Sequence, residues 1–137
     1  MASNAERLDA LYDGFWKRGD WHAGAEVMAP DIEWNGMDDD ATLGGTRIGA
    51  RAVNVFFAEW LEAWEVADVS WQITELTPDL LLVRSRLTAR GRGSGLDTSA
   101  EIGQVWEFEN GKAIRQTMYR KFEDAQRAAD ALLTPDV

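Results

Sequence analysis

One glutamine interrupts the apolar face of a predicted strand and is the first candidate for chemistry in this sequence. Residues 102 to 108 alternate with a period of two, which places Gln104 on the same face as Ile102, Trp106 and Phe108. A polar side chain in an apolar layer costs free energy unless it finds a hydrogen-bond partner. Gln104 is therefore either satisfied inside the protein or available to hydrogen-bond a ligand.

The residue types of the chain exclude several kinds of catalytic site. The 137 residues contain no cysteine, so no disulfide, thiolate nucleophile or thiolate metal site can form. The single histidine, His22, rules out a centre built on several histidine ligands. The acidic run at residues 38–40 lacks the spacing and the distal glutamate of a calcium loop, and we interpret it as solvated. We therefore expect neither a metal ion nor a cofactor.

The net charge of −10 argues against a nucleic-acid partner, because an acidic chain repels phosphate backbones. Four arginines between residues 84 and 92 are a local exception, which we interpret as a solvated face or an interface. No apolar run approaches membrane-spanning length, and the first residues lack the apolar segment of a signal peptide. The sequence thus predicts a cytoplasmic protein without membrane association.

Apolar spacing and helix breakers predict four helices. Asn4 is a candidate cap for a first helix that ends near residue 18, and a short second helix follows over residues 20–30. A long amphipathic helix with a broad apolar face covers residues 49–65, and a final helix covers residues 123–133.

Alternating apolar residues predict five strands. They cover residues 31–35, 67–76, 80–89, a long strand through residue 101 to 109, and 113–121. Asn110-Gly111 favours a tight hairpin turn between the last two. On strand 80–89 the more apolar face, which includes Leu81 and Val83, is expected to point inward and to leave Arg84 and Arg86 outside.

This element order predicts one α+β domain over residues 1–137. Helices would gather on one face of an antiparallel meander. A strongly curved sheet wrapped around the long helix would form a cone, with a cavity between the helices and the concave face.

Four segments of the chain resemble the nuclear transport factor 2-like superfamily, and within it the SnoaL-like branch. They are LYDGFWKRGDW, APDIEWNG, GGTRIGARAV and QVWEFENGKAIRQTMYRKFEDAQRA, which in this order cover nearly the whole chain. The resemblance implies a cone-shaped fold with a central hydrophobic cavity and a homodimer formed through the outer sheet face. The branch includes polyketide cyclases, ketosteroid isomerases, limonene epoxide hydrolases, dehydratases and binding or scaffolding domains, so the fold does not choose a function.

The resemblance to ketosteroid isomerases implies roles for three residues. The tyrosine on the first helix of those enzymes matches Tyr12, eight residues before Asp20. Their aspartate base corresponds to Asn35, which is not a base, and their protonated aspartate on the hairpin strand corresponds to Gln104. Two hydrogen-bond donors, Tyr12 and Gln104, would then polarise a carbonyl or enolate without the base that proton abstraction needs.

Other members of the branch give partial correspondences. Asn35 resembles the water-holding asparagine of limonene epoxide hydrolases, and Arg84 or Arg86 could stand for their arginine, but the partnering acid two residues later is missing. SnoaL-like cyclases often place an acid before the tyrosine of the last strand, where this chain has Met118 before Tyr119.

The expected site is thus a pocket with few polar groups and apolar walls. Tyr12, Asn35 and Gln104 are its candidate catalytic residues, and Gln116 on the next strand is a further hydrogen-bonding group. The apolar wall candidates are Trp16, Trp34, Trp60, Trp106 and Met118. This composition suits a small, mostly hydrophobic molecule held by few polar contacts.

Three functions fit this pattern. The first is an enzyme that isomerises, cyclises or dehydrates an apolar ring compound, with a base drawn from His22, Glu33 or residues 38–40. The second is a non-catalytic binding domain, favoured because Asn35, Gln104 and Met118 replace the usual acids. The third is an oligomerisation module whose pocket has lost its role.

Overall fold

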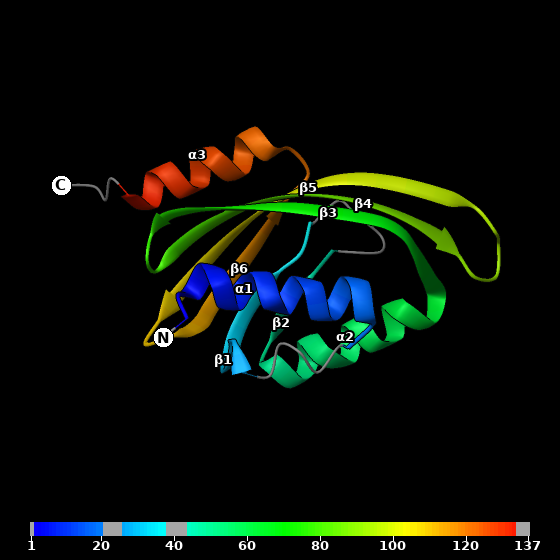
Figure 1. Ribbon diagram of the computed structural model, residues 1–137, viewed down its shortest axis with the longest axis horizontal. Coiled ribbons are helices and arrows are strands. Elements are labelled where there is room, and N and C mark those ends of the chain that lie inside the picture. Colours follow the sequence, from blue (N-terminus) through cyan, green and yellow to red (C-terminus); the bar gives the residue numbers. More distant parts are fainter. Residues whose placement is uncertain (1, 21–25, 38–43, 134–137) are drawn as a thin grey trace.

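The computed structural model describes residues 2–20, 26–37 and 44–133. A curved six-stranded sheet has α1 (Asn4–Tyr12) and α2 (Ala50–Ala63) on one face and α3 (Phe122–Leu133) on the other (Figure 1). A π-helical segment, η1 (Asp13–Lys17), directly continues α1. The predicted α+β class and curved sheet are confirmed, although the last helix lies on the face opposite to the other two.

The sheet has the strand order β2-β1-β6-β5-β4-β3. Its strands are β1 (Met28–Asn35), β2 (Thr46–Ile48), β3 (Trp64–Thr77), β4 (Leu80–Gly91), β5 (Asp97–Glu109) and β6 (Lys112–Tyr119). All neighbours are antiparallel except β1 and β6, which run parallel, so the sheet is mixed. Consecutive strands joined by short turns must be antiparallel, whereas β1 and β6 are far apart in the chain and are free of that constraint.

Two details of the N-terminal region differ from the sequence prediction. Ser3, not Asn4, caps α1, because its hydroxyl accepts from the Glu6 N–H at 3.1 Å while Glu6 Oε1 accepts from the Ser3 N–H at 3.2 Å. The predicted second helix is wrong for residues 28–30, which belong to β1; residues 21–25 lie outside the described part. Met28 is in register with Ala113 of β6, so sheet pairing prevails over local helix preference.

Strand β4 is buried on both faces along its first half. Leu81 and Val83 belong to the core between the sheet and the helices α1 and α2, whereas Leu80 and Leu82 pack beneath α3. Farther along the strand Arg84 and Arg86 are exposed, as predicted from the apolar face. Within the described residues no helix is both long and apolar enough to cross a membrane.

Candidate functional site

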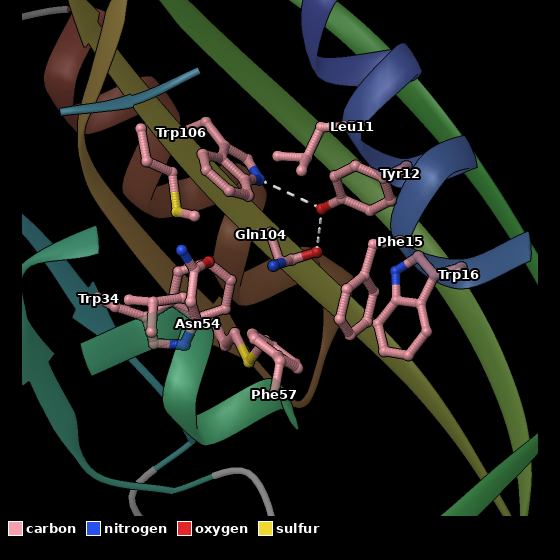
Figure 2. A pocket seen from close by; sticks show the side chains of 12 residues that line it. Leu11, Tyr12, Phe15, Trp16, Trp34, Asn54, Phe57, Gln104 and Trp106 are labelled. Atoms are coloured by element: carbon pink, nitrogen blue, oxygen red, sulfur yellow. Dashed lines mark hydrogen bonds between the residues drawn. The ribbon is translucent and has the colours of Figure 1, made fainter. Parts of the chain in front are cut away.

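A small cavity lies between the N-terminal helix, α2 and the concave face of the sheet (Figure 2). Its volume is about 50 Å³. Its lining residues are Leu11, Tyr12, Phe15, Trp16, Met28, Trp34, Val53, Asn54, Phe57, Gln104, Trp106 and Met118. Leu11, Trp16 and Asn54 are half-buried and the other lining residues are buried, so these three mark the side on which the cavity approaches the surface.

A chain of hydrogen bonds runs through the buried polar groups at the floor of the cavity. Trp106 Nε1 donates to the Tyr12 hydroxyl at 3.2 Å, and that hydroxyl donates to Gln104 Oε1, as the dashed lines of Figure 2 show. Gln104 Nε2 donates to Gln116 Oε1 at 2.7 Å, and Gln116 Nε2 donates to the Asn35 backbone carbonyl at 3.3 Å. Gln104 and Gln116 are buried, and each finds its partners within the chain.

The direction of every bond in this hydrogen-bond chain follows from its two ends, the Trp106 indole and the Asn35 backbone carbonyl. An indole N–H can only donate, so Trp106 requires the Tyr12 oxygen to accept. A backbone carbonyl can only accept, so Gln116 must present its amide nitrogen to Asn35 and its oxygen to Gln104. Gln104 then presents its nitrogen to Gln116 and its oxygen to Tyr12. The hydroxyl hydrogen of Tyr12 is therefore committed to Gln104.

The environment of Tyr12 keeps its phenol neutral. Burial raises the pKa of Tyr12 far above its ordinary value of 10.0, and the hydrogen bond from Trp106 only partly offsets this effect. Because no charged form is accessible near neutral pH, the hydroxyl can serve as a hydrogen-bonding group but not as a general base there.

Aromatic rings form most of the cavity wall. Trp34 of β1 contacts Phe57 of α2 and Trp106 of β5 in edge-to-face geometry, with ring centroids 5.2 Å and 5.6 Å apart. Phe15 packs edge-on against Phe57 at 4.7 Å and against Trp16 at 4.5 Å. Phe15 and Trp16 lie in the π-helical segment η1, so the wider turn places both rings at the cavity.

The structure moves one predicted site residue out of the cavity. The Asn35 side chain donates to Glu33 Oε2 at 2.8 Å and accepts from the Thr46 hydroxyl at 3.0 Å. Residues 33 and 35 share one strand face, and the buried residues Ile32 and Trp34 take the other. The expectation that the Asn35 amide converges with Tyr12 and Gln104 is therefore wrong; only its backbone carbonyl joins the hydrogen-bond chain.

The remaining predicted residues divide between the cavity and the layer around it. Trp16, Trp34, Trp106 and Met118 line the cavity with Tyr12 and Gln104. Gln116 and Trp60 are buried but are not among the lining residues. Trp60 packs against two other indoles, with ring centroids 5.7 Å from Trp16 and 6.2 Å from Trp64.

Asn54 is a lining residue that the sequence analysis missed. It lies on α2 between Val53 and Phe57, at the edge of that helix's apolar face. Its side chain makes no hydrogen bond to the residues that the structure describes. The sequence did contain a signal for this position, because Asn54 is a polar residue next to Val53 and one turn from Phe57. The broad apolar face of the helix obscured it.

No Asp, Glu, His, Lys or Arg is found among the described residues that line the cavity. Glu33, a proposed source of a base, lies on the other strand face and pairs with Arg115 at 3.1 Å. His22 and residues 38–40, the other proposed sources, lie outside the described residues. Within the described part of the chain, no group of three or more acidic or histidine side chains is placed to hold a metal ion.

The curved sheet, with helices and a cavity on its concave face, has the nuclear transport factor 2-like fold. The sequence model of the SnoaL-like domain family matches residues 8–116, and the chain belongs to that family. Among curated proteins, no significant sequence match was found.

Solved structures share this fold at low sequence identity. A protein from Mesorhizobium loti, provisionally named a SnoaL-like polyketide cyclase, is 18% identical with a TM-score of 0.70 over 86% of this chain and 99% of its own. A provisionally named isomerase from Rhodopseudomonas palustris is 18% identical with a TM-score of 0.68, over 96% and 98% of the two chains. TerC, co-crystallised with polyporic acid, is 21% identical with a TM-score of 0.66, over 94% and 99%. At these identities the likeness shows the fold alone.

Proposed function

We propose that this protein binds a small, uncharged and mostly apolar ring compound in the cavity, and that binding rather than proton transfer is its activity. The observation that carries the proposal is the chemistry of the described lining, whose polar side chains are neutral amides, indoles and one phenol. A charged ligand would lose its hydration without gaining a counter-charge there, which costs several kcal/mol.

The size of the cavity limits the ligand to about one ring, which fits only if the lining side chains move apart. Its volume of about 50 Å³ is far below the 300–1,000 Å³ typical of pockets for drug-sized molecules. Entry therefore requires half-buried side chains such as Leu11 and Trp16 to move aside. The aromatic walls offer faces and edges against which a flat or saturated ring can pack.

The hydrogen-bond chain supports the binding role over the isomerase role. In an isomerase of the resembled type Tyr12 and Gln104 would both donate to one substrate oxygen, whereas here Tyr12 donates to Gln104 itself. Gln104 keeps only one amide hydrogen that is not committed to Gln116. A ligand can thus be oriented by Gln104 without the paired donors that stabilise an oxyanion.

A titration of tryptophan fluorescence tests the proposal. Acetophenone, cyclohexanone and toluene should quench or shift the emission with saturable binding, while benzoate, matched to acetophenone in size, should bind at least about tenfold more weakly. Tighter binding of benzoate, or no saturation with any neutral compound, would refute the proposal. A β,γ-unsaturated cyclic ketone should isomerise no faster with protein than in buffer; a protein-dependent rate lost in Tyr12→Phe would favour the enzyme instead.

The homodimer expected from the family stays a prediction. Helix α3 covers the outer sheet face over Leu80, Leu82 and Val105, which leaves a charged strip on β4 and β5 for a partner. On that strip Arg84 lies 2.8 Å from Glu101, so its charges already pair within the chain. An interface there would be polar, and sedimentation equilibrium at low and high salt would show whether it forms.

A further inference from the structure

Trp34 lines the cavity, and its buried indole N–H has no hydrogen-bond partner among the described residues. The side chain is 5% exposed, so bulk water does not compensate this group. Buried donors are nearly always paired, because an unpaired donor loses the free energy of its hydration without gaining a hydrogen bond in return. An indole N–H can only donate, so the partner it lacks is an acceptor.

The other polar groups at the cavity are largely committed elsewhere. Tyr12 gives its hydrogen to Gln104 and receives one from Trp106. Gln104 has one amide hydrogen to spare, since the other is donated to Gln116. The side-chain amide of Asn54, on the adjacent wall, makes no hydrogen bond to the described residues and can donate or accept. The lining side chains with an uncommitted hydrogen are therefore Trp34, Gln104 and Asn54.

We infer that the cavity selects a ligand with an uncharged hydrogen-bond acceptor, such as a ketone or ether oxygen, and that the Trp34 indole N–H donates to this acceptor. This inference rests on the proposed binding function, because it requires a ligand in the cavity. The acceptor would supply the partner that Trp34 lacks, while the ring of the ligand packs against the neighbouring aromatic side chains. A hydrocarbon of the same shape fills the same space but leaves the donor unmatched.

Trp60 provides a matched control within the same chain. Its indole nitrogen is also buried without a partner among the described residues, and its side chain is 7% exposed against 5% for Trp34. Trp60 is not a lining residue of the cavity. Trp60→Phe and Trp34→Phe thus remove the same donor from similar surroundings, but only Trp34→Phe removes it from the ligand site.

The experiment compares acetophenone with α-methylstyrene, which replaces the carbonyl oxygen by a methylene group. The measured quantity is the ratio of the two dissociation constants for wild type, Trp34→Phe and Trp60→Phe, determined by calorimetry. Comparing this ratio between proteins cancels the different hydration of the two ligands. Trp34→Phe should reduce the preference for the ketone about fivefold to tenfold, and Trp60→Phe should leave it within about twofold.

The outcomes separate this inference from the proposed function. If wild type binds both compounds but Trp34→Phe keeps the wild-type ratio, the inference is wrong while the binding function stands. If wild type binds neither compound, the proposed function itself fails. A ratio that falls equally in both variants would also overturn the inference, because the effect would then come from general repacking.

A second measurement applies if Trp34→Phe does not fold. In a two-dimensional ¹⁵N–¹H spectrum of the wild-type protein, acetophenone should move the indole proton of Trp34 downfield, as expected for a new hydrogen bond. α-Methylstyrene should not. Nuclear Overhauser effects from the neighbouring aromatic protons assign the resonance to Trp34. Its persistence in Trp60→Phe shows that it does not belong to Trp60. A ketone-specific shift on a different indole, or on none, would contradict the assignment to Trp34.

Discussion

The hydroxyl of Tyr12 donates its hydrogen to Oε1 of Gln104, and this bond ties the first helix to β5 across 92 positions of the chain. The same hydroxyl accepts from the Trp106 indole, so three residues of the cavity lining restrain one another. Tyr12 and Gln104, which correspond to a catalytic pair in the resembled enzymes, here hydrogen-bond to each other. Tyr12 and Gln104 are therefore not two free donors facing the cavity.

Tyr12→Phe should destabilise the protein by about 2–3 kcal/mol. The substitution leaves Gln104 Oε1 and the Trp106 N–H buried without their partner, and each unmatched group costs about 1–3 kcal/mol, moderated by relaxation. Urea denaturation followed by tryptophan fluorescence measures the change. Tyr119→Phe is the control, because Tyr119 is only half-buried. A cost below about 0.5 kcal/mol at Tyr12 would show that the hydrogen-bond chain contributes little.

Gln104→Glu should make stability depend on pH in a defined direction. A carboxylate at position 104 can accept from Tyr12. Its second oxygen, however, would replace the Gln104 Nε2 that donates to Gln116 Oε1 at 2.7 Å in the wild type, so two acceptors would face each other. The protonated acid can donate to Gln116, so the folded state favours the neutral form of the introduced carboxyl. Burial favours the neutral form as well. Folding therefore raises the pKa of this carboxyl above its unfolded value of about 4.3. The variant should resemble wild type near pH 4 and lose about 1.4 kcal/mol per pH unit above it, until the pH passes the raised pKa.

Urea unfolding of wild type and Gln104→Glu at each pH from 4 to 8 measures this difference. Gln104→Leu is the control: it removes the hydrogen bonds without introducing a titrating group, so its cost should not vary with pH. A flat difference for Gln104→Glu would mean that water or a rearranged Gln116 solvates the carboxylate.

Asn35→Ala should raise the pKa of Glu33 and leave ligand binding unchanged. The hydrogen bond from Asn35 is the largest cause that holds the pKa of Glu33 below its ordinary value of 4.5, and the charge of Arg115 adds to it. A lowered pKa contributes stability above the unfolded pKa that is lost as the pH falls through the folded pKa. NMR titration of the Glu33 carboxyl carbon measures the shift, with Thr46→Val as a control that keeps the Asn35 donor. Weakened ketone binding in Asn35→Ala would place Asn35 at the cavity after all.

Gly103→Ala should destabilise the packing of α3 on the sheet. A Cβ at position 103 would lie 2.7 Å from the Cβ of Ala125 and 3.1 Å from the Cα of Phe122, so the helix would have to shift. Overpacking of this kind costs about 1–3 kcal/mol. Gly93→Ala is the control, since a Cβ there meets nothing within 4 Å and its φ is not positive. Thermal unfolding should show a lower midpoint for Gly103→Ala alone, and equal midpoints would mean that α3 moves freely.

Much of the fold could be predicted because its signals are local. The two-residue alternation correctly assigned Leu81 and Val83 inward and Arg84 outward, since side chains alternate along any extended strand. The same alternation places Asn35 on the face of Glu33, opposite Ile32 and Trp34, and the resemblance to an enzyme with an acid at position 35 led to the wrong assignment. The strand β2 and the parallel pairing of β1 with β6 carried no such signal, because three residues show no period and distant pairing leaves no local trace.

The site was predictable in its composition but not in its connections. The residue pattern identified Gln104 as a buried polar group that needs a partner, and it identified most of the aromatic wall. It could not show that the partner is Tyr12, or that Trp34 lacks one.

Face assignment and burial follow from short-range geometry, which the order of residues along the chain determines by itself. Which polar groups satisfy one another, and in which direction each hydrogen points, depends on contacts between residues far apart in sequence. The hydrogen bonds from Trp106 through Tyr12, Gln104 and Gln116 to the Asn35 carbonyl acquire their direction only when α1, β5, β6 and β1 come together. An indole donor at one end and a backbone acceptor at the other then orient every group between them.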